Sequence, residues 1–213
     1  MSKTIQKVTG FVIREVQGEQ QLLVFRHPFT GIQIPAGTVE IGEALEVAVL
    51  REVAEEGGLT DVRIVECLGV EQVQLPENQR VVLDHPRVYA RLDDTSFDWG
   101  YFRRGITVEV LRQSGAFTQV KYEELDRVPG PHYVSMSLMG WVPTELLAAT
   151  RERHFYLLEF SGESADSWTT FTDNHTFTPF WALVSDLPRI IPPQDRWLVY
   201  LRKAIPHVKM RSS

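Results

Sequence analysis

The chain has 213 residues, of which 43% are hydrophobic and 23% are charged, as in an ordinary globular protein with a sizeable core. This length fits one large domain, or one domain that carries an insertion. The formal net charge of -6 at pH 7 argues against a long nucleic-acid ligand, because phosphate backbones bind basic surfaces. A single nucleotide chelated to a metal ion remains compatible with this charge.

The cysteine content and the lengths of the apolar runs indicate the cellular compartment of the protein. A single cysteine, Cys67, excludes an intrachain disulfide and favours a reducing compartment. It lies in a strand pattern, where we expect a small buried residue. No apolar run reaches the length of a membrane span, and the first residues lack the apolar core of a signal peptide. We therefore expect a cytoplasmic protein that binds no membrane.

The first third of the chain predicts a hairpin, a loop, a helix and a strand. Two β-rich runs at residues 7–16 and 20–27 are separated by QGEQ, which is typical of a hairpin. Residues 28–43 are punctuated by Gly and Pro and predict a loop or a short bent strand. Residues 43–56 contain no Gly or Pro and give the strongest helix signal; because this helix is apolar nearly all round its middle, we expect it to be buried between layers. Residues 61–75 return to a strand pattern.

Residues 76–152 form a longer connection than the surrounding strands need. Strand patterns are predicted there at residues 87–92, 105–113 and 117–125. A loop is predicted at residues 128–137, and a short helix with Thr144 as its N-cap is predicted at residues 142–153. Connections longer than about 15 residues usually carry their own structure or a function. We therefore predict an inserted β-rich subdomain, either a lid over a cleft or a dimer contact, within a main domain of residues 1–75 and 153–213.

The last part of the chain returns to strands and ends in a helix. Residues 154–162 and 176–184 have strand patterns. Residues 192–205 predict a helix, because Trp197, Leu198 and Leu201 recur at helical spacing.

Three glutamates, Glu52, Glu55 and Glu56, crowd the end of the first predicted helix, within a sector of about 100°. Gly57 and Gly58 are residues that end helices, so the carboxylates lie at the negative end of the helix dipole, where each anion is disfavoured by about 0.3–1 kcal/mol. Most helical glutamates simply face water. A divalent cation would reverse these unfavourable terms, and Mg²⁺ takes carboxylate oxygens and substrate phosphates as ligands. The cluster therefore indicates a metal site.

A wider pattern surrounds these glutamates. Residues 37–59 fit G-x5-E-x7-R-E-U-x-E-E-x-G-U, where U is aliphatic. The fixed positions are Gly37, Glu43, Arg51, Glu52, Glu55, Glu56 and Gly58, and the aliphatic ones are Val53 and Leu59. With every position matched, the sequence resembles the Nudix hydrolase family.

The resemblance implies a fold, a metal site and an enzyme. It implies an α/β/α sandwich around a mixed β-sheet, in which the signature forms a loop, a helix and a loop. Glu52, Glu55 and Glu56 would bind Mg²⁺ or Mn²⁺, the backbone carbonyl of Gly37 would add a ligand, and Arg51 with Glu43 would orient the glutamates. The family typically hydrolyses the pyrophosphate of a nucleoside diphosphate linked to another group, through attack by water.

One carboxylate must take the proton of the attacking water. Glu55 and Glu56 are the candidates within the signature. Glu159, Asp173 and His175 are candidates outside it, although a surface or capping role is favoured at least two to one for each of these three. Phosphate-binding candidates are Arg26, His27, Arg103 and Arg104. Trp99, Tyr101, Phe102 and Trp168 are candidates for stacking on a base, with core packing as the alternative.

Several functions fit these residues. The sequence IPAG is similar to the LPAG of ADP-ribose pyrophosphatases, so the first expectation is a Nudix pyrophosphohydrolase that acts on an ADP-ribose-like substrate or a nucleotide sugar. A nucleoside triphosphate pyrophosphatase is the second, since it needs the same metal site. A non-catalytic nucleotide sensor is the third, and it is disfavoured because such domains commonly lose signature glutamates. We expect a small-molecule partner and, since such pyrophosphatases are often dimers, a homodimer.

Overall fold

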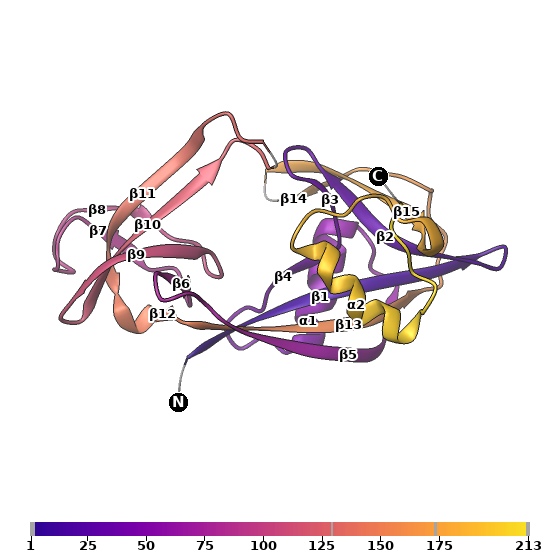
Figure 1. Ribbon diagram of the computed structural model, residues 1–213, viewed down its shortest axis with the longest axis horizontal. Helices are drawn as coiled ribbons and strands as arrows, with labels where there is room; N and C mark the ends of the chain where they lie inside the picture. The colour runs from indigo at the N-terminus through magenta and orange to yellow at the C-terminus, as the bar shows by residue number, and fades with distance from the viewer. Residues whose placement is uncertain (1–2, 129, 173, 212–213) are drawn as a thin grey trace. The chain divides into compact units, whose positions relative to one another are not determined.

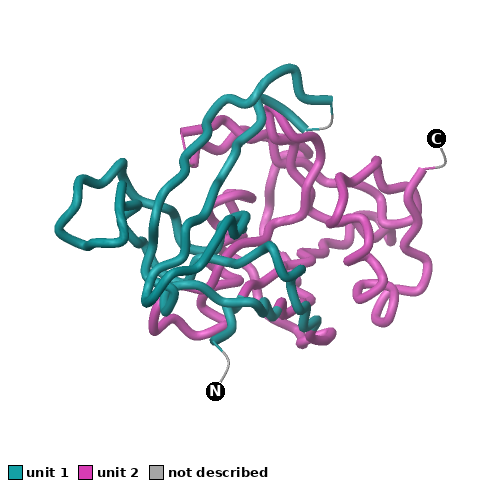
Figure 2. The backbone as a smooth tube through the Cα atoms, turned by 60° about the vertical axis from the view of Figure 1, so that its left-hand side comes forward, with its two compact units in different colours: residues 1–6, 71–152 teal, residues 7–70, 153–213 magenta. Residues whose placement is uncertain are grey.

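The computed structural model describes residues 3–128, 130–172 and 174–211 of the chain (Figure 1). The chain divides into two compact units (Figure 2). Unit 1 comprises residues 1–6 and 71–152, and unit 2 comprises residues 7–70 and 153–213. The boundaries of unit 1 lie close to those predicted for an inserted subdomain, residues 76–152. A role of these residues as a lid or a dimer contact stays a prediction.

The main sheet is eight-stranded, in the order β14-β15-β2-β1-β13-β5, with β3 paired to β2 and β4 paired to β1. Its strands are β1 (Thr4–Val16), β2 (Glu19–His27), β3 (Gly31–Gln33), β4 (Ala36–Thr38), β5 (Val62–Gln74), β13 (Thr150–Phe160), β14 (Thr170–Thr172) and β15 (His175–Leu183). The predicted hairpin of β1 and β2 is confirmed. Its two turn residues, Gln17 and Gly18, have positive φ angles of 55° and 81°, as a tight hairpin turn requires.

Two helices cover opposite faces of this sheet in unit 2. Side chains alternate between the faces of a strand. Val8, Val12 and Leu23 therefore pack with α1 (Leu45–Gly57), whereas their neighbours Phe11, Ile13 and Leu22 pack with α2 (Gln194–Ala204). Gly10 lies under α1, where an added Cβ would come within 2.8 Å of Val53 Cγ2. The predicted α/β/α sandwich is confirmed.

Unit 1 is built on a second sheet with its own core. The sheet is seven-stranded, in the order β12-β6-β9-β10-β11-β7-β8. Its strands are β6 (Gln79–Val82), β7 (Arg87–Tyr89), β8 (Asp98–Tyr101), β9 (Thr107–Ser114), β10 (Phe117–Leu125), β11 (Val134–Pro143) and β12 (Leu147–Ala148). Val82, Phe102, Val120 and Val142 are among the buried side chains of its core. The predicted β-rich character of this segment is confirmed.

Two of the elements predicted in unit 1 are wrong. The helix predicted for residues 142–153 is a single 3-10 turn, η1 (Thr144–Leu146), followed by β12 and β13. The Thr144 side chain caps nothing and hydrogen-bonds Thr118, and the residues after it pair with β6 instead of continuing a helix. The loop predicted for residues 128–137 gives way to β11 at Val134, because pairing with β10 extends the strand.

Two burial expectations are also wrong. The helix α1 buries one face only, and Val47 on its other face is 56% exposed, so α1 covers the sheet without a further layer outside it. Cys67 is exposed, since β5 is the last strand in the sheet order.

The remaining short element of unit 2 is the 3-10 turn η2 (Val184–Asp186). Within the described part of the chain, no helix has the length and apolar character needed to span a membrane.

Candidate functional site

The helix α1 carries the three predicted metal-binding glutamates at its C-terminal end. Ala48, Val49 and Val53 fix the helix on the sheet through their buried side chains. Gly58 ends the helix in a left-handed conformation, with φ 68°, and its N–H donates to the carbonyl of Ala54 at 2.9 Å. This local sequence therefore places Glu52, Glu55 and Glu56 on the last turns, as predicted.

Arg51 connects the helix to the loop before it. Its Nε and Nη2 donate to the two carboxylate oxygens of Glu43 at 2.9 and 3.0 Å, and Nη2 also donates to the carbonyl of Thr38 at 3.0 Å. Its Nη1 donates to Glu52 at 2.9 Å and to Glu55 at 3.1 Å. The Arg51 hydrogen bonds lower the pKa of Glu43, and those with Glu43 in turn raise the pKa of Arg51. One guanidinium thus holds three carboxylates and the loop together.

Glu52 is the buried member of the group, with 8% of the residue exposed. Burial raises its pKa to about 7 against the opposing effect of Arg51. Its carboxylate lies against the α carbon of Gly37, where an added Cβ would come within 1.9 Å of Glu52 Oε1. Only glycine leaves room for the carboxylate at this position.

Glu56 and Glu55 differ in their surroundings. Glu56 Oε2 accepts a hydrogen bond from the backbone N–H of Ala36 at 2.8 Å, so it too holds the signature loop. The Glu55 side chain is 46% exposed. All the signature glutamates therefore gather between the end of α1 and the segment from Ala36 to Glu43.

The signature carboxylates are not arranged around a common position for a metal ion. Within residues 3–128, 130–172 and 174–211, no three His, Cys, Asp or Glu side chains are arranged to hold a metal ion. Arg51 Nη1 instead lies between Glu52 and Glu55. The structure brings the predicted metal-binding residues together in one cluster, and their role as ligands stays a prediction.

Two side chains from a distant segment hold the C-terminal carbonyls of α1. Trp168 Nε1 donates to the carbonyl of Gly57 at 2.9 Å, and Thr170 Oγ1 donates to that of Glu56 at 3.3 Å. Trp168 was a candidate for stacking on a base, but here its indole N–H caps the helix. More than 100 residues separate Trp168 from α1, so no short-range sequence pattern indicates this contact.

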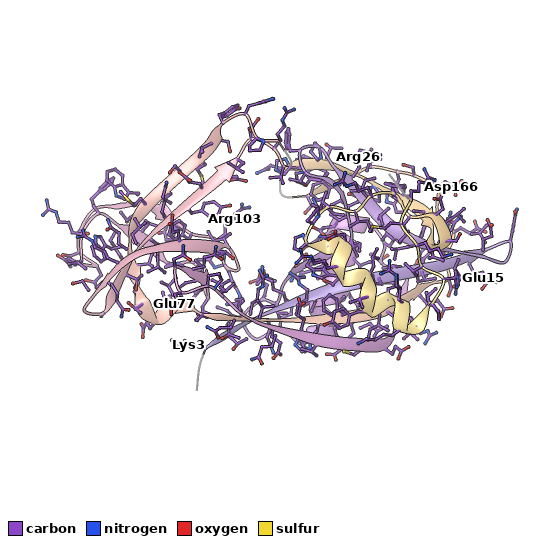
Figure 3. All side chains as sticks on the ribbon, in the orientation of Figure 1. Lys3, Glu15, Arg26, Glu77, Arg103 and Asp166 are labelled. Atoms are coloured by element: carbon purple, nitrogen blue, oxygen red, sulfur yellow. The ribbon has the colours of Figure 1, made fainter. Side chains whose placement is uncertain are left out.

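The predicted phosphate-binding residues are divided between the two units of the chain, with Arg26 and His27 in unit 2. Arg26 is exposed on β2, next to Val24 and Phe25 (Figure 3). Because Val24 packs with α2, the alternation of the strand puts Arg26 on the sheet face opposite α1. Arg103 and Arg104 belong to unit 1. Substrate binding by Arg26 and Arg104 stays a prediction.

The other candidates are distributed over both units. Glu159 is exposed on β13 and pairs with Arg63, and His175 contacts His27 at 5.2 Å between ring centroids. Asp173 lies outside the described residues. Phe102 is 1% exposed in the core of unit 1, whereas Trp99 and Tyr101 are exposed on β8. Core packing therefore accounts for Phe102.

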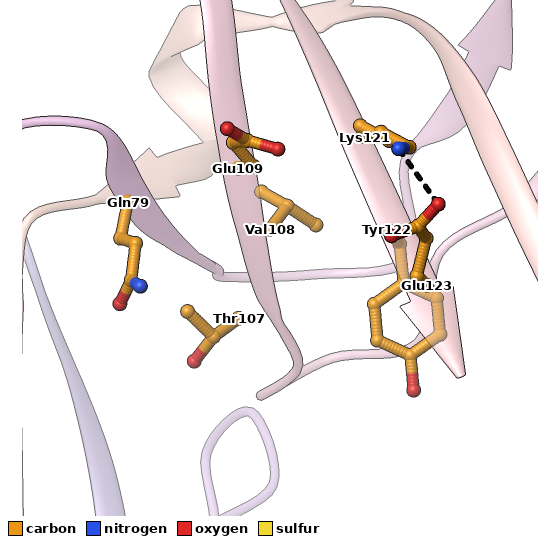
Figure 4. Close-up of a pocket in the computed structure, with 7 residues that line it drawn as sticks. All are labelled: Gln79, Thr107, Val108, Glu109, Lys121, Tyr122 and Glu123. Carbon is orange, nitrogen blue, oxygen red and sulfur yellow. Dashed lines mark ion pairs between the residues drawn. The ribbon is translucent and has the colours of Figure 1, made fainter. Parts of the chain in front are cut away.

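Unit 1 also contains a surface pocket of about 220 Å³ on β9 and β10 (Figure 4). Glu109, Lys121 and Glu123 are among the residues that line it, and Lys121 pairs with Glu123 at 2.6 Å. None of the predicted site residues lines this pocket, so it adds nothing to the carboxylate cluster.

Several solved structures are similar to this chain at low sequence identity. The Nudix domain of Shewanella oneidensis NrtR, complexed with ADP ribose, has a TM-score of 0.48 at 12% identity and covers 96% of this chain and 90% of its own. A C. elegans Ap4A hydrolase has a TM-score of 0.44 at 13% identity, covering 97% and 100%. The E. coli dihydroneopterin triphosphate pyrophosphohydrolase has a TM-score of 0.36 at 12% identity, covering 80% and 75%. No curated protein matches in sequence.

The family assignment is based on the sequence model of the NUDIX domain, which matches residues 4–131, more than half of the chain. The matched span contains the whole signature from Gly37 to Leu59, whose side chains form the cluster described above. The chain therefore belongs to the Nudix family, and its class of activity is the hydrolysis of pyrophosphate bonds.

Proposed function

We propose that this chain uses Mg²⁺ or Mn²⁺ to hydrolyse the pyrophosphate of a nucleoside diphosphate linked to another moiety, such as ADP-ribose or a nucleotide sugar. The observation that carries the proposal is the gathering of Glu43, Glu52 and Glu55 around the single guanidinium of Arg51. Glu56 accepts the N–H of Ala36, and the Glu52 carboxylate lies against Gly37. This excess of negative charge suits a cation, and a chelated pyrophosphate supplies further phosphate ligands.

The donor set fits a divalent metal ion. Nudix hydrolases generally use divalent metals, and carboxylate oxygens are the ligands that Mg²⁺ prefers. Glu52, Glu55, Glu56 and the carbonyl of Gly37 are the groups that would hold it. The buried position of Glu52 supports this, since a nearby cation would stabilise the ionised carboxylate that burial disfavours. When bound, such an ion neutralises the pyrophosphate and acidifies water.

The protein's own groups have separate tasks in this proposal. Arg51, held by both oxygens of Glu43, positions Glu52 and Glu55. Either Glu55 or Glu56 acts as the general base that takes a proton from water. Exposure favours Glu55, whose side chain is 46% exposed, over Glu56, which accepts the N–H of Ala36. A nucleoside triphosphate would use the same groups, so that substrate class is the alternative. The homodimer and the cytoplasmic location stay predictions.

Hydrolysis of a substrate panel tests the proposal. The panel holds ADP-ribose, nucleotide sugars, dinucleoside polyphosphates, NADH, coenzyme A and the common triphosphates, each with Mg²⁺, with Mn²⁺ and with EDTA. We expect turnover of ADP-ribose or a nucleotide sugar that is lost in EDTA and falls by at least about 100-fold in Glu56→Gln. Glu46→Gln, at the exposed first turn of the same helix, is the matched control and should keep wild-type turnover. Turnover of triphosphates alone would overturn the proposed substrate class.

A further inference from the structure

Aromatic and imidazole side chains form a row along β2 on the sheet face that carries α1. Leu23 packs with α1, and an added Cβ on Gly57 would come within 2.7 Å of Leu23 Cδ2. Alternation along β2 puts Phe25 and His27 on the same face as Leu23. Each step of two residues advances about 7 Å along the strand, so these rings follow one another along β2 from Leu23, the residue against which the end of α1 packs.

The neighbouring strand β15 contributes to the same row. Trp181 packs on the α1 side, and alternation puts His175 and Phe177 there too. Phe25 and Phe177 stack with 5.0 Å between centroids, and His27 lies 5.1 Å from Phe177. Phe29 covers both imidazoles, at 6.0 Å from His27 and 5.6 Å from His175. We call these five residues, Phe25, His27, Phe29, His175 and Phe177, the ring cluster.

The ring cluster has a buried floor and an open top. Phe25 and Phe177 are 0% and 4% exposed, whereas Phe29 is 52% exposed and the two histidines are half-buried. Burial of an exposed aromatic ring under a flat ligand is favourable, because it removes apolar surface from water. The open edge of the cluster is therefore suited to an aromatic ligand.

One strand connects the ring cluster to the end of α1. In β14, Thr170 pairs with Phe177 and Thr172 pairs with His175. The Thr170 hydroxyl also donates to the carbonyl of Glu56 at 3.3 Å. Paired strands lie about 5 Å apart, so Phe177 is within one strand spacing of a residue that contacts the backbone of Glu56. The ring cluster and the end of α1 are therefore connected through a single strand.

The hydrogen bonding of His27 suits a nucleotide base as a ligand. The backbone N–H of Phe29 donates to His27 Nδ1 at 3.1 Å, which assigns the proton of the neutral ring to Nε2. Burial, with a contribution from His175, lowers the pKa of His27, which favours the neutral ring. A neutral imidazole with an N–H donor and an adjacent phenyl ring offers both hydrogen bonding and stacking to a base.

We propose that the ring cluster binds the base of the nucleoside diphosphate substrate, with Phe29 stacking on the base and His27 beside it. This inference rests on the proposed function, because the phosphates must lie at the glutamates for the base to reach the rings.

Equilibrium binding of two probes in Mg²⁺ tests the inference: ADP, which has a base, and inorganic pyrophosphate, which has none. We expect Phe29→Ala to weaken ADP binding by roughly 5- to 100-fold, as for loss of one base–aromatic stack, and to leave pyrophosphate binding unchanged. Phe29→Trp should restore ADP binding. Phe171→Ala is the matched control, since Phe171 is 73% exposed on β14, and alternation puts it on the other face from Thr170.

The outcomes separate the two proposals. Wild-type ADP affinity in Phe29→Ala would overturn the ring cluster as the base site and leave the proposed function intact. Equal weakening of ADP by Phe171→Ala would also overturn it. Absence of Mg²⁺-dependent binding of pyrophosphate by the wild-type protein would overturn the proposed function, and the base site with it.

Discussion

Gly37 is required to be a glycine because the Glu52 side chain packs directly against its α carbon. The Glu52 carboxylate occupies the space that a Cβ on residue 37 would take, and burial there raises its pKa to about 7. The signature glycine is therefore explained by packing, whether or not its carbonyl also binds a metal. Any larger residue at this position must displace the one buried carboxylate of the cluster.

Replacing Gly37 by Ala should weaken metal binding as well as the fold. The added methyl group lies 1.9 Å from Glu52 Oε1, so the carboxylate must turn away, and overpacking of this kind costs about 1–3 kcal/mol of stability. We expect at least a tenfold loss of Mn²⁺ affinity, measured by titration calorimetry, beside a urea unfolding curve.

Gly140→Ala supplies the control for this prediction. It inserts a methyl group 2.6 Å from Val88 Cγ1 in unit 1, so it should also lower stability but leave Mn²⁺ affinity unchanged. Unchanged Mn²⁺ affinity in Gly37→Ala would contradict the placement of Glu52 in the metal site.

At the scale of elements, the end of α1 is fixed by a segment more than 100 residues later in the chain. The last carbonyls of a helix have no partner within it. Here the Gly57 and Glu56 carbonyls accept hydrogen bonds from Trp168 and Thr170, while Gly58 closes the helix from within. The loop before the helix is held from the other side by Arg51 and Glu56. The glutamates are thus positioned from two directions.

Trp168→Phe tests the cap. The change keeps an aromatic ring and removes the N–H donor to Gly57. We expect a loss of about 1–3 kcal/mol in the free energy of unfolding, the cost of a buried acceptor left without its partner. Urea denaturation followed by circular dichroism measures it. Trp99→Phe makes the same chemical change at a residue that is 59% exposed, and should alter stability by less than about 0.5 kcal/mol. Equal stabilities of the two variants would show that the indole N–H does not support the helix.

At the scale of the whole molecule, each unit has its own hydrophobic core, and the signature glutamates all belong to unit 2. The chain passes between the units within β1, β5 and β13. A ligand of the folded state stabilises the parts of the protein that it contacts, by about 2.7 kcal/mol at 100 times its Kd. Metal binding should therefore protect unit 2 selectively.

Hydrogen exchange followed by mass spectrometry tests this expectation. Saturating Mg²⁺ should slow exchange in peptides covering residues 36–57, and chelation by EDTA should reverse the change. Peptides covering residues 79–125 of unit 1 should exchange at the same rate in both conditions. Glu56→Gln is the control for non-specific effects of Mg²⁺ and should show reduced protection. Protection confined to unit 1 would place the metal elsewhere.

Local sequence determined much of this protein. Two β-rich runs separated by QGEQ specified the β1–β2 hairpin, and the run without Gly or Pro before Gly57 specified α1. The spacing from Gly37 to Leu59 specified the family and its fold. These features depend on neighbours within one hairpin or one helix, which sequence patterns record directly. The predicted helix at residues 142–153 failed because pairing with β6, a partner distant in sequence, outweighed local propensity.

Only the tertiary structure decided the features that join distant segments. The cap of α1 by Trp168, the carboxylate of Glu52 against Gly37 and the meeting of His27 with His175 each bring together residues from separate elements. The exposure of Val47 and Cys67 likewise depends on which elements cover them and on the order of strands in the sheet. The sequence determined which side chains we predict to carry the chemistry. Their surroundings were decided by packing between elements, because burial and hydrogen-bond partners depend on contacts that no local pattern encodes.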